Sequence, residues 1–481
     1  MSDVRVRFAP SPTGELHIGS VRTTLYNFLF ARQNRGALIL RIEDTDQERL
    51  VPGAIDSIYD GLHWLGIRWD EGPREGGPFA PYVQSERLSL YRERANELVA
   101  TDRAYPCFCS RERLDAMRRE QEKRHEVTRY DRLCRRIAPA DAKRRVGGGE
   151  AHTIRLKVPE DGAIVAHDLI HGDVSWQLKD IDDQIIMKSD GFPTYHLAVV
   201  VDDHVMRITH VLRGDEWFPS LPKHLLLYRF LGWDAPLHGH LPLVLGPDHK
   251  KLSKRHGATA VREFRDQGYL PEALVNYLAL LGWASGTEEE VFTMEQLVER
   301  WSIEHLQDSP AVWDKARLDW FNGVHIRMLD DADLAERLGE FLPAGASPDA
   351  IRAAVPLIKE RIKTFVDARE MLAFLFTDDL EYPIELLVGK RQPAEVRRVL
   401  ERASEIVSTG PFTPERIETE LRRFAAESGA KVNDVFMPVR VAVTGRSVSP
   451  PLDGSILLLG RDRALRRLRH AIARLSEPVA A

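Results

Sequence analysis

The chain has 481 residues, 43% of them hydrophobic and 29% charged, a length that exceeds one hydrophobic core and predicts roughly three or four domains. Its 67 basic and 73 acidic residues give a net charge of −6, which argues against a nucleic-acid partner unless basic residues gather on one surface. No apolar run reaches the about 20 residues that span a membrane, and MSDVRVRFAP lacks the apolar core of a signal peptide, so we expect a cytoplasmic protein with no membrane partner.

The N-terminal part predicts a strand, a helix and a second strand. Val4–Pro10 alternates and is rich in β-formers, and Val21–Arg32 has apolar residues one helical turn apart. Ala37–Asp44 is apolar up to its charged end, which is usual for a strand buried on both faces of a parallel sheet. A strand, a helix and a strand within about 40 residues form a βαβ unit, so we expect an α/β fold.

The loop between the first strand and the helix, Ala9–Ser20, reads APSPTGELHIGS. It follows the carboxyl end of a strand, where open α/β sheets bind ligands, and the N–H groups at the start of the next helix suit a phosphate. Gly14 and Gly19 permit close approach to the backbone, and His17 can donate a hydrogen bond to a phosphate or ribose oxygen. The alternative is a turn closed by a capping histidine.

Helices are predicted over Gly53–Leu65 and Ser85–Thr101, and the segment from Arg103 to about Ile186 then reads as an insertion. It holds all three cysteines, a charged helix and β-like runs such as HTIRLKV. Three cysteines in a chain of this length do not make a disulfide framework and fit a reducing compartment. The basic stretch Arg111–Arg145 is either a phosphate-facing surface or a solvated helix face.

After the insertion, Asp190–His204 is an apolar strand or helix of the sheet type, and Ile208–Trp217 supplies another strand. The sequence PLVLGPDHKKLSKRHGA follows and places Lys250, Lys251 and Lys254 in one loop. These lysines repel one another unless a bound anion, such as a triphosphate, relieves the charge. Phosphoryl and nucleotidyl transfer needs such charge stabilisation, whereas the alternative is a solvated basic turn.

Beyond about Asn322 the strand pattern gives way to helices. Ser347–Pro348 and Thr413–Pro414 place an N-cap residue before a proline at the first helical position, and Gly429 is a candidate C-cap. Two thirds of the chain are therefore α/β and the final third is all-α. The basic stretch Gly460–Leu475, like Arg111–Arg145, is either a phosphate-facing surface or a solvated helix face.

Five motifs in order resemble those of the class I aminoacyl-tRNA synthetases, and together those of the bacterial glutamyl-tRNA synthetase family. They are RFAPSPTGELHIG, RIEDTD, DGFPTYHLA, VLRGDEW and KLSKRHGA, and the likeness extends to the tail VFMPVRVAVTGRSVSPPLDGSILLLGRDRALRRL. The resemblance implies a ligase that makes glutamyl-adenylate and pyrophosphate from ATP and L-glutamate. It then transfers glutamate to the terminal adenosine of tRNA(Glu), with tRNA(Gln) as a further candidate. ATP with Mg²⁺ and a monomeric protein are also implied.

The resemblance also implies a fold. It consists of a Rossmann-like catalytic domain with a parallel sheet, an inserted α+β acceptor-binding domain, and all-α anticodon-binding domains. A β-barrel in the C-terminal region would instead indicate a glutaminyl-tRNA synthetase or the archaeal and eukaryotic type of glutamyl-tRNA synthetase. The expected boundaries are 1–102 and 187–240 for the two catalytic halves, 103–186 for the inserted acceptor-stem domain, 241–321 for a stem-contact domain with the KLSKR loop, and 322–378 and 379–481 for two helical anticodon-binding domains.

Two sets of active-site residues follow from the resemblance. Arg7 and Arg213 would pair with the γ-carboxylate, because arginine is always charged and binds carboxylates in bidentate geometry, and Glu43 would pair with the α-ammonium. The full glutamate set is Arg7, Ser11, Glu43, Tyr195, Arg213, Glu216 and Trp217. The ATP set is Pro10, Thr13, His17, Gly19, Lys251, Leu252, Ser253, Lys254 and Arg255, of which His17, Gly19, Lys251 and Lys254 are the catalytic candidates.

One departure from the family concerns the amino-acid pocket: Val199 stands where some members have asparagine. A second concerns zinc, which many relatives bind in the insertion through three cysteines and a histidine. Cys107, Cys109 and Cys134 are present here, and a Cys-x-Cys pair can share a metal. The histidine position holds Arg136, which cannot be a ligand. The fourth ligand would then be Tyr130 or His125, and the alternative is three reduced cysteines without a metal.

The helical last third bears on the choice between function classes. Arg361 aligns with a family position near the anticodon, with a solvated helix residue as the alternative. A short tRNA-modifying paralogue lacks this region, and a nucleotidyltransferase acting on a small metabolite would not need it. A non-catalytic tRNA-binding relative would be expected to have lost His17 or the lysines.

Overall fold

The computed structural model describes residues 4–475, apart from the side chain of Lys254. The chain divides into two compact units. Unit 1 comprises the described residues up to Phe264 together with Leu274–Lys315. Unit 2 comprises Arg265–Ala273 and the described residues from Ala316 onward. Within the described part of the chain, no helix is long and apolar enough to cross a membrane.

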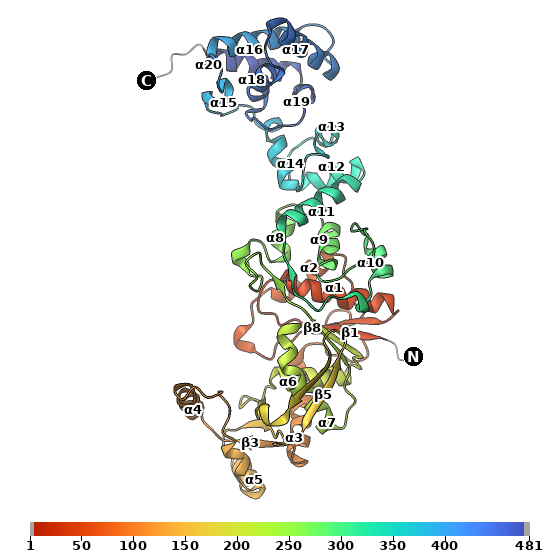
Figure 1. Cartoon of the computed structure of the whole chain (residues 1–481), viewed down its shortest axis with the longest axis vertical. Coiled ribbons are helices and arrows are strands. Elements are labelled where there is room, and N and C mark those ends of the chain that lie inside the picture. Colours follow the sequence, from red (N-terminus) through yellow and green to blue (C-terminus); the bar gives the residue numbers. More distant parts are fainter. Residues whose placement is uncertain (1–3, 476–481) are drawn as a thin grey trace. The chain divides into compact units, whose positions relative to one another are not determined.

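Unit 1 is built on a parallel α/β core. β1 (Arg5–Phe8) and β2 (Ala37–Leu40) pair in parallel and are connected by α1 (Ile18–Gln33), so the predicted βαβ unit is confirmed. β8 (His210–Gly214) begins beside β1, where the Thr209 N–H donates to the Arg5 carbonyl, and it pairs in parallel with β9 (Leu237–Leu241). β1 and β8 lie next to each other in this core (Figure 1).

The region predicted as an insertion contains two different sheets. An antiparallel sheet is formed by β3 (Ala104–Cys107), β4 (Thr153–Leu156) and β7 (Ile185–Met187). The hairpin of β5 (Ala163–Asp168) and β6 (Gly172–Gln177) instead joins β9, since Asp168 pairs in parallel with His238. The four-stranded sheet has the order β6-β5-β9-β8. This hairpin therefore brings residues of the insertion next to the strands of the parallel core.

The segment Asp190–His204, which the sequence left open between strand and helix, is helical. α6 (Tyr195–Val205) carries an apolar run that is buried on nearly every side, so its burial pattern has no helical period. The other helices of this part are α2 (Ala54–Trp64), α3 (Leu88–Ala100), α4 (Arg111–Lys123), α5 (Pro139–Gly147) and α7 (Leu221–Leu231). After β10 (Val244–Leu245) come α8 (Val261–Asp266), α9 (Pro271–Ala279), α10 (Met294–Arg300) and β11 (Ala311–Val312).

Unit 2 is helical, as predicted. Ser347 and Thr413 are N-caps with proline at the next position, and Gly429 ends its helix with a positive φ of 70°, which a glycine adopts without strain. The helices are α11 (Lys315–Met328), α12 (Asp331–Gly339), α13 (Pro348–Ile358), α14 (Phe365–Leu372), α15 (Ile384–Val388), α16 (Pro393–Ser408), α17 (Pro414–Ser428), α18 (Val432–Thr444), α19 (Leu452–Leu459) and α20 (Arg461–Arg474).

The basic helix α20 uses most of its arginines inside the protein. Arg461 donates to the carbonyls of Ser408 and Gly410, and Arg474 donates to that of Tyr382. Arg463 and the buried Arg467 donate to further carbonyls in the same way. These guanidinium groups satisfy backbone oxygens that have no partner within their own helices or turns. Neither open alternative, a phosphate-facing surface or a solvated face, describes these four side chains.

Candidate active site

A cavity of about 1210 Å³ lies at the carboxyl ends of β1, β2 and β8. Open parallel α/β sheets bind their ligands at this edge, outside the carboxyl ends of the strands. Of the described side chains that the sequence assigned to the site, Ser253 and Arg255 do not line it; Ser253 N–H donates to His256 and Arg255 pairs with Asp248. Lys254 lies in a short 3₁₀ turn, and its side chain is outside the described part. The lining includes Arg7, Pro10, Ser11, Thr13, His17, Gly19, Glu43, Tyr195, Arg213, Glu216, Trp217, Lys251 and Leu252.

The start of α1 forms one wall of the cavity. His17 is the N-cap, and its Nδ1 accepts from the Gly19 N–H at 3.1 Å, which leaves the proton of the neutral ring on Nε2. A Cβ at Gly19 would lie 3.3 Å from this Nδ1, so a side chain there would crowd the cap. The Ile18 N–H donates to the Thr259 carbonyl at 2.9 Å. The first loop and the segment after KLSKR are thus joined through their backbones.

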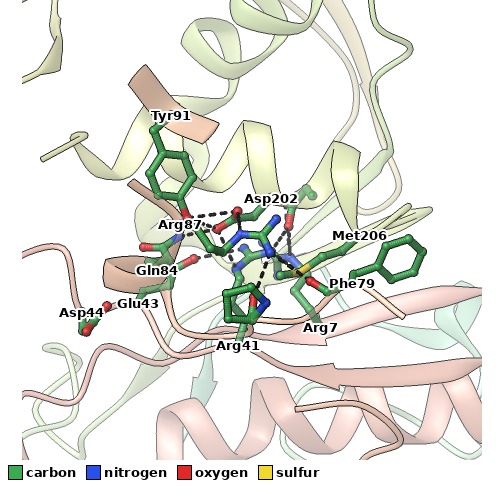
Figure 2. A network of polar contacts seen from close by, with 12 residues as sticks. Arg7, Arg41, Glu43, Asp44, Phe79, Gln84, Arg87, Tyr91, Asp202 and Met206 are labelled. Carbon is green, nitrogen blue, oxygen red and sulfur yellow. Dashed lines mark hydrogen bonds and ion pairs between the residues drawn. The ribbon is translucent and has the colours of Figure 1, made fainter. Parts of the chain in front are cut away.

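A buried group of ion pairs supports the end of the cavity that Arg7 and Glu43 line. Arg41 lies at its centre and pairs with Asp203 at 2.7 Å and with Glu43 at 3.0 Å, while the Arg7 Nε lies 3.3 Å from Asp203 (Figure 2). Burial would raise the pKa of Asp203, but the guanidinium groups of Arg7 and Arg41 lower it overall. Arg5, which the alternation could not distinguish from Arg7, instead pairs with Glu71.

Asp202 extends this network to the adjoining helix. It accepts hydrogen bonds from Arg87 and Tyr91 at 2.8 Å each and from Gln84 at 2.9 Å (Figure 2). Three arginines and three carboxylates balance each other there in low dielectric, so each buried charge depends on its partners. Sequence reasoning missed Arg41, Asp202 and Asp203, although two acidic residues inside the apolar run of α6 signalled buried ion pairs.

Asp203→Asn is expected to destabilise this core by about 3–5 kcal/mol, because the substitution leaves Arg41 with a buried charge and a weaker partner. Hydrogen exchange of peptides from β1, β2 and α6 measures the opening free energy. The matched control is Asp115→Asn, because Asp115 forms an exposed pair with Arg118 at 3.3 Å in the same unit. Equal protection in both variants would contradict a role for this network in stability.

Arg213 is held differently from Arg7. Its Nε donates to His240 Nε2 at 2.9 Å, and its NH1 donates to the Tyr195 hydroxyl at 3.1 Å and to His224 Nδ1 at 3.2 Å. Burial lowers the pKa of both histidines, so they are neutral at pH 7. These acceptors orient the guanidinium without cancelling its charge, which suits a site for an anionic group. The ring of Trp217 lies 4.3 Å from that of Tyr195 and closes this side.

Two further predicted residues, Lys251 and Glu216, lie beside each other in the lining. Lys251 Nζ is 3.4 Å from Glu216 Oε1, and both side chains are exposed, so the pair is weak enough for an incoming anion to replace the carboxylate.

Val199 is buried in a hydrophobic cluster of α6 and does not line the cavity. The polar contact that an asparagine would supply there is therefore absent from the described lining.

The three cysteines lie together in the inserted region. The sulfur atoms of Cys107, Cys109 and Cys134 are within 4.8 Å of one another. The Tyr130 hydroxyl lies 3.3 Å from the Cys107 sulfur and 3.4 Å from that of Cys109. His125 is exposed and is not part of this group in the described chain. Three cysteine sulfurs this close together can share one zinc ion.

Arg361 lies in unit 2, just after α13, and its side chain is exposed. Burial and the nearby charge of Arg361 lower the pKa of Arg440, so the two cations are close. Two neighbouring cations favour an anionic ligand such as a phosphate.

Comparisons with known proteins point in one direction. The family model "tRNA synthetases class I (E and Q), catalytic domain" matches residues 3–320, and the model "Anticodon binding domain" matches residues 333–472. A glutamate–tRNA ligase of Dehalococcoides mccartyi is 48% identical over 486 residues, which cover 99% of this chain and 98% of that one. The corresponding ligase of Treponema denticola is 42% identical over 501 residues, covering 98% and 99%. The crystal structure of a glutamate tRNA ligase from Elizabethkingia meningosepticum in complex with its amino acid has a TM-score of 0.88 and 34% identity, over 98% of this chain and 100% of that one.

Proposed function

Because the chain belongs to the class I glutamyl-tRNA synthetases, we propose that it activates L-glutamate with ATP and transfers it to the 3′-terminal adenosine of tRNA(Glu). The observation that carries this proposal is the cavity in which Arg213 keeps an uncancelled charge opposite a helix start suited to phosphate. The reaction serves translation. ATP, glutamate and tRNA are its three substrates.

Glutamate would occupy the end of the cavity that holds the two arginines. Arg7 and Arg213 bind the γ-carboxylate, and Glu43 binds the α-ammonium. Glutamine would leave the Arg213 guanidinium, which is held by neutral partners, underpaired, and this favours glutamate. The remaining pocket residues are Ser11, Tyr195, Glu216 and Trp217.

ATP would bind beside the start of α1. A glutamate α-carboxylate oxygen attacks the α-phosphorus, the bond to the β-phosphate oxygen breaks, and pyrophosphate leaves. His17 donates to a phosphate oxygen through Nε2, and Gly19 admits the nucleotide to the helix start. Lys251 and Lys254 stabilise the charge that develops on the phosphates, and Mg²⁺ accompanies ATP. The rest of the proposed ATP set is Pro10, Thr13 and Leu252, which line the cavity, together with Ser253 and Arg255, which do not line it in this structure.

The two units supply tRNA contacts in this proposal. The catalytic segments are 1–102 and 187–240. The acceptor end of the tRNA is contacted by residues 103–186, inserted between these two segments, and by residues 241–321, which follow the second. The helical segments 322–378 and 379–481 bind the anticodon, and Arg361 belongs to the first of them. The protein acts as a monomer in the cytoplasm.

We further propose that Cys107, Cys109, Cys134 and Tyr130 hold zinc, which would fix the fold of the inserted region. Protein purified from zinc-supplemented cells is expected to carry close to one zinc ion per chain, and Cys134→Ser is expected to lose it. His125→Ala is the control, because His125 lies outside the group. Metal analysis showing less than about 0.1 zinc per chain in the unsubstituted protein would contradict a tetrahedral site of this kind.

Aminoacylation with labelled glutamate on purified tRNA(Glu) and tRNA(Gln) tests the function. We expect charging of tRNA(Glu) and pyrophosphate–ATP exchange that requires tRNA. Exchange with a small metabolite in place of glutamate and tRNA would indicate a nucleotidyltransferase, and tRNA binding without exchange would indicate a non-catalytic relative. The tRNA(Gln) arm decides whether a second acceptor is used.

A further inference from the structure

Asp168, the last residue of β5, is buried directly behind Arg213's histidine partner. Its Oδ1 accepts three backbone hydrogen bonds, from Ile170 at 3.0 Å and from His171 and His240 at 3.2 Å each. Its Oδ2 lies 2.6 Å from Nδ1 of the His240 ring. Both carboxylate oxygens of Asp168 therefore have hydrogen-bond partners: backbone N–H groups for Oδ1 and the imidazole for Oδ2.

These contacts determine where the proton of His240 lies. Burial would raise the pKa of Asp168, but the hydrogen bond from His240 and those from the backbone N–H groups lower it to about 2, so Oδ2 can only accept. On the other side of the ring, the Arg213 Nε can only donate, and it lies 2.9 Å from His240 Nε2. Both neighbours thus require the same neutral tautomer, with hydrogen on Nδ1 and a lone pair on Nε2.

The histidine separates a carboxylate from the arginine that it orients. A carboxylate in direct contact with Arg213 would hold the side chain but would also cancel the charge that a substrate carboxylate needs. His240 passes on the orientation through a neutral ring. His224 acts in the same manner on the other side, because its Nδ1 accepts from Arg213 and its Nε2 lies 3.0 Å from His196 Nδ1.

We propose that Asp168 and His240 are positioning residues for amino-acid selection: Asp168 fixes the tautomer of His240, and His240 holds Arg213 toward the substrate's γ-carboxylate without neutralising it. This inference rests on the proposed role of Arg213 in binding glutamate. Asp168 belongs to the hairpin predicted as part of the insertion, so the insertion supplies a residue that supports the amino-acid pocket.

Asp168→Asn tests the proposal with little change in shape. The amide oxygen must stay with the three N–H donors, so the amide NH₂ faces His240 Nδ1 and makes that nitrogen an acceptor. The proton then moves to Nε2, where it opposes the Arg213 N–H. We expect the KM for glutamate to rise about tenfold or more while the KM for ATP stays the same. Asp173→Asn is the matched control, because Asp173 contacts His167 at 2.7 Å in an exposed pair on the same hairpin.

Two measurements separate this role from a merely structural one. In ¹⁵N-histidine NMR of the full chain, assigned by the signals lost in His240→Gln, we expect an unprotonated Nε2 in the unsubstituted protein and a protonated one in Asp168→Asn. In an Arg213→Ala background, Asp168→Asn should have no further effect on the KM for glutamate.

A protonated Nε2 in the unsubstituted protein would overturn the inference even if Asp168→Asn fails to fold. So would an unchanged KM in Asp168→Asn, or an equal rise in the Arg213→Ala background. If Arg213→Ala alone leaves the KM for glutamate unchanged, the proposed glutamate pocket fails, and the positioning role fails with it. The last outcome is thus distinguishable from the first three.

Discussion

Arg213→Ala is expected to lower kcat/KM for glutamate by about 10²–10⁴-fold, since two hydrogen bonds between charged groups contribute roughly 1.5–3 kcal/mol each and 1.4 kcal/mol is a factor of ten. At least tenfold of this loss is expected in KM, because the substituted site has lost a cation that acts on the bound substrate before the reaction. The groups that hold this side chain are neutral acceptors, so none of them can supply the lost positive charge. Steady-state pyrophosphate exchange at varied glutamate measures the effect.

The same variant should discriminate less between glutamate and glutamine, because the arginine that an amide leaves underpaired is gone. Arg229→Ala is the control, since Arg229 is exposed on α7 in the same unit. An unchanged KM for glutamate in Arg213→Ala would contradict the assignment of this residue to the γ-carboxylate.

The order of elements could be predicted because local patterns determine it. The alternation of Val4–Pro10 and the apolar run Ala37–Asp44 predicted the βαβ unit, and the confirmed caps at Ser347 and Thr413 depend only on adjacent residues. α6 was ambiguous because a helix buried on nearly all sides has no polar face to mark its period.

The partners of the site residues could not be predicted, because they are distant in sequence. Arg5 and Arg7 share the same alternation on β1, yet one pairs with Glu71 and the other with Asp203. Asp168 reaches His240 only because β5 leaves the inserted region and pairs with β9. Strand order between segments far apart in the chain depends on tertiary packing, which no local pattern contains.

The partners of the arginines on α20 could not be predicted from the sequence either. Its arginine-rich sequence was compatible with a phosphate-facing or a solvated surface, but Arg463 and Arg467 donate to carbonyls of other segments of unit 2. A guanidinium has five donors and serves a backbone oxygen as readily as a phosphate. Composition alone cannot separate these two uses.

Lys251→Ala and Lys254→Ala are each expected to slow glutamate activation by about 10²–10³-fold, the usual effect of removing one group that stabilises charge developing in a transition state. Lys251 lies beside the cavity, and its exposed ion pair with Glu216 at 3.4 Å is weak enough for an incoming anion to replace the carboxylate. Because we propose that these lysines act on the phosphates, we expect the KM for glutamate to change little.

Lys250→Ala provides the comparison for these two variants. Lys250 is adjacent in sequence and exposed, and it does not line the cavity in the described part of the chain. If bulk positive charge were sufficient, all three substitutions would slow activation equally. If position determines the effect, single-turnover formation of glutamyl-adenylate should fall in Lys251→Ala and Lys254→Ala and should be retained in Lys250→Ala. A loss of glutamate affinity as large as the loss of rate would contradict the division between an amino-acid end and a phosphate end of the cavity.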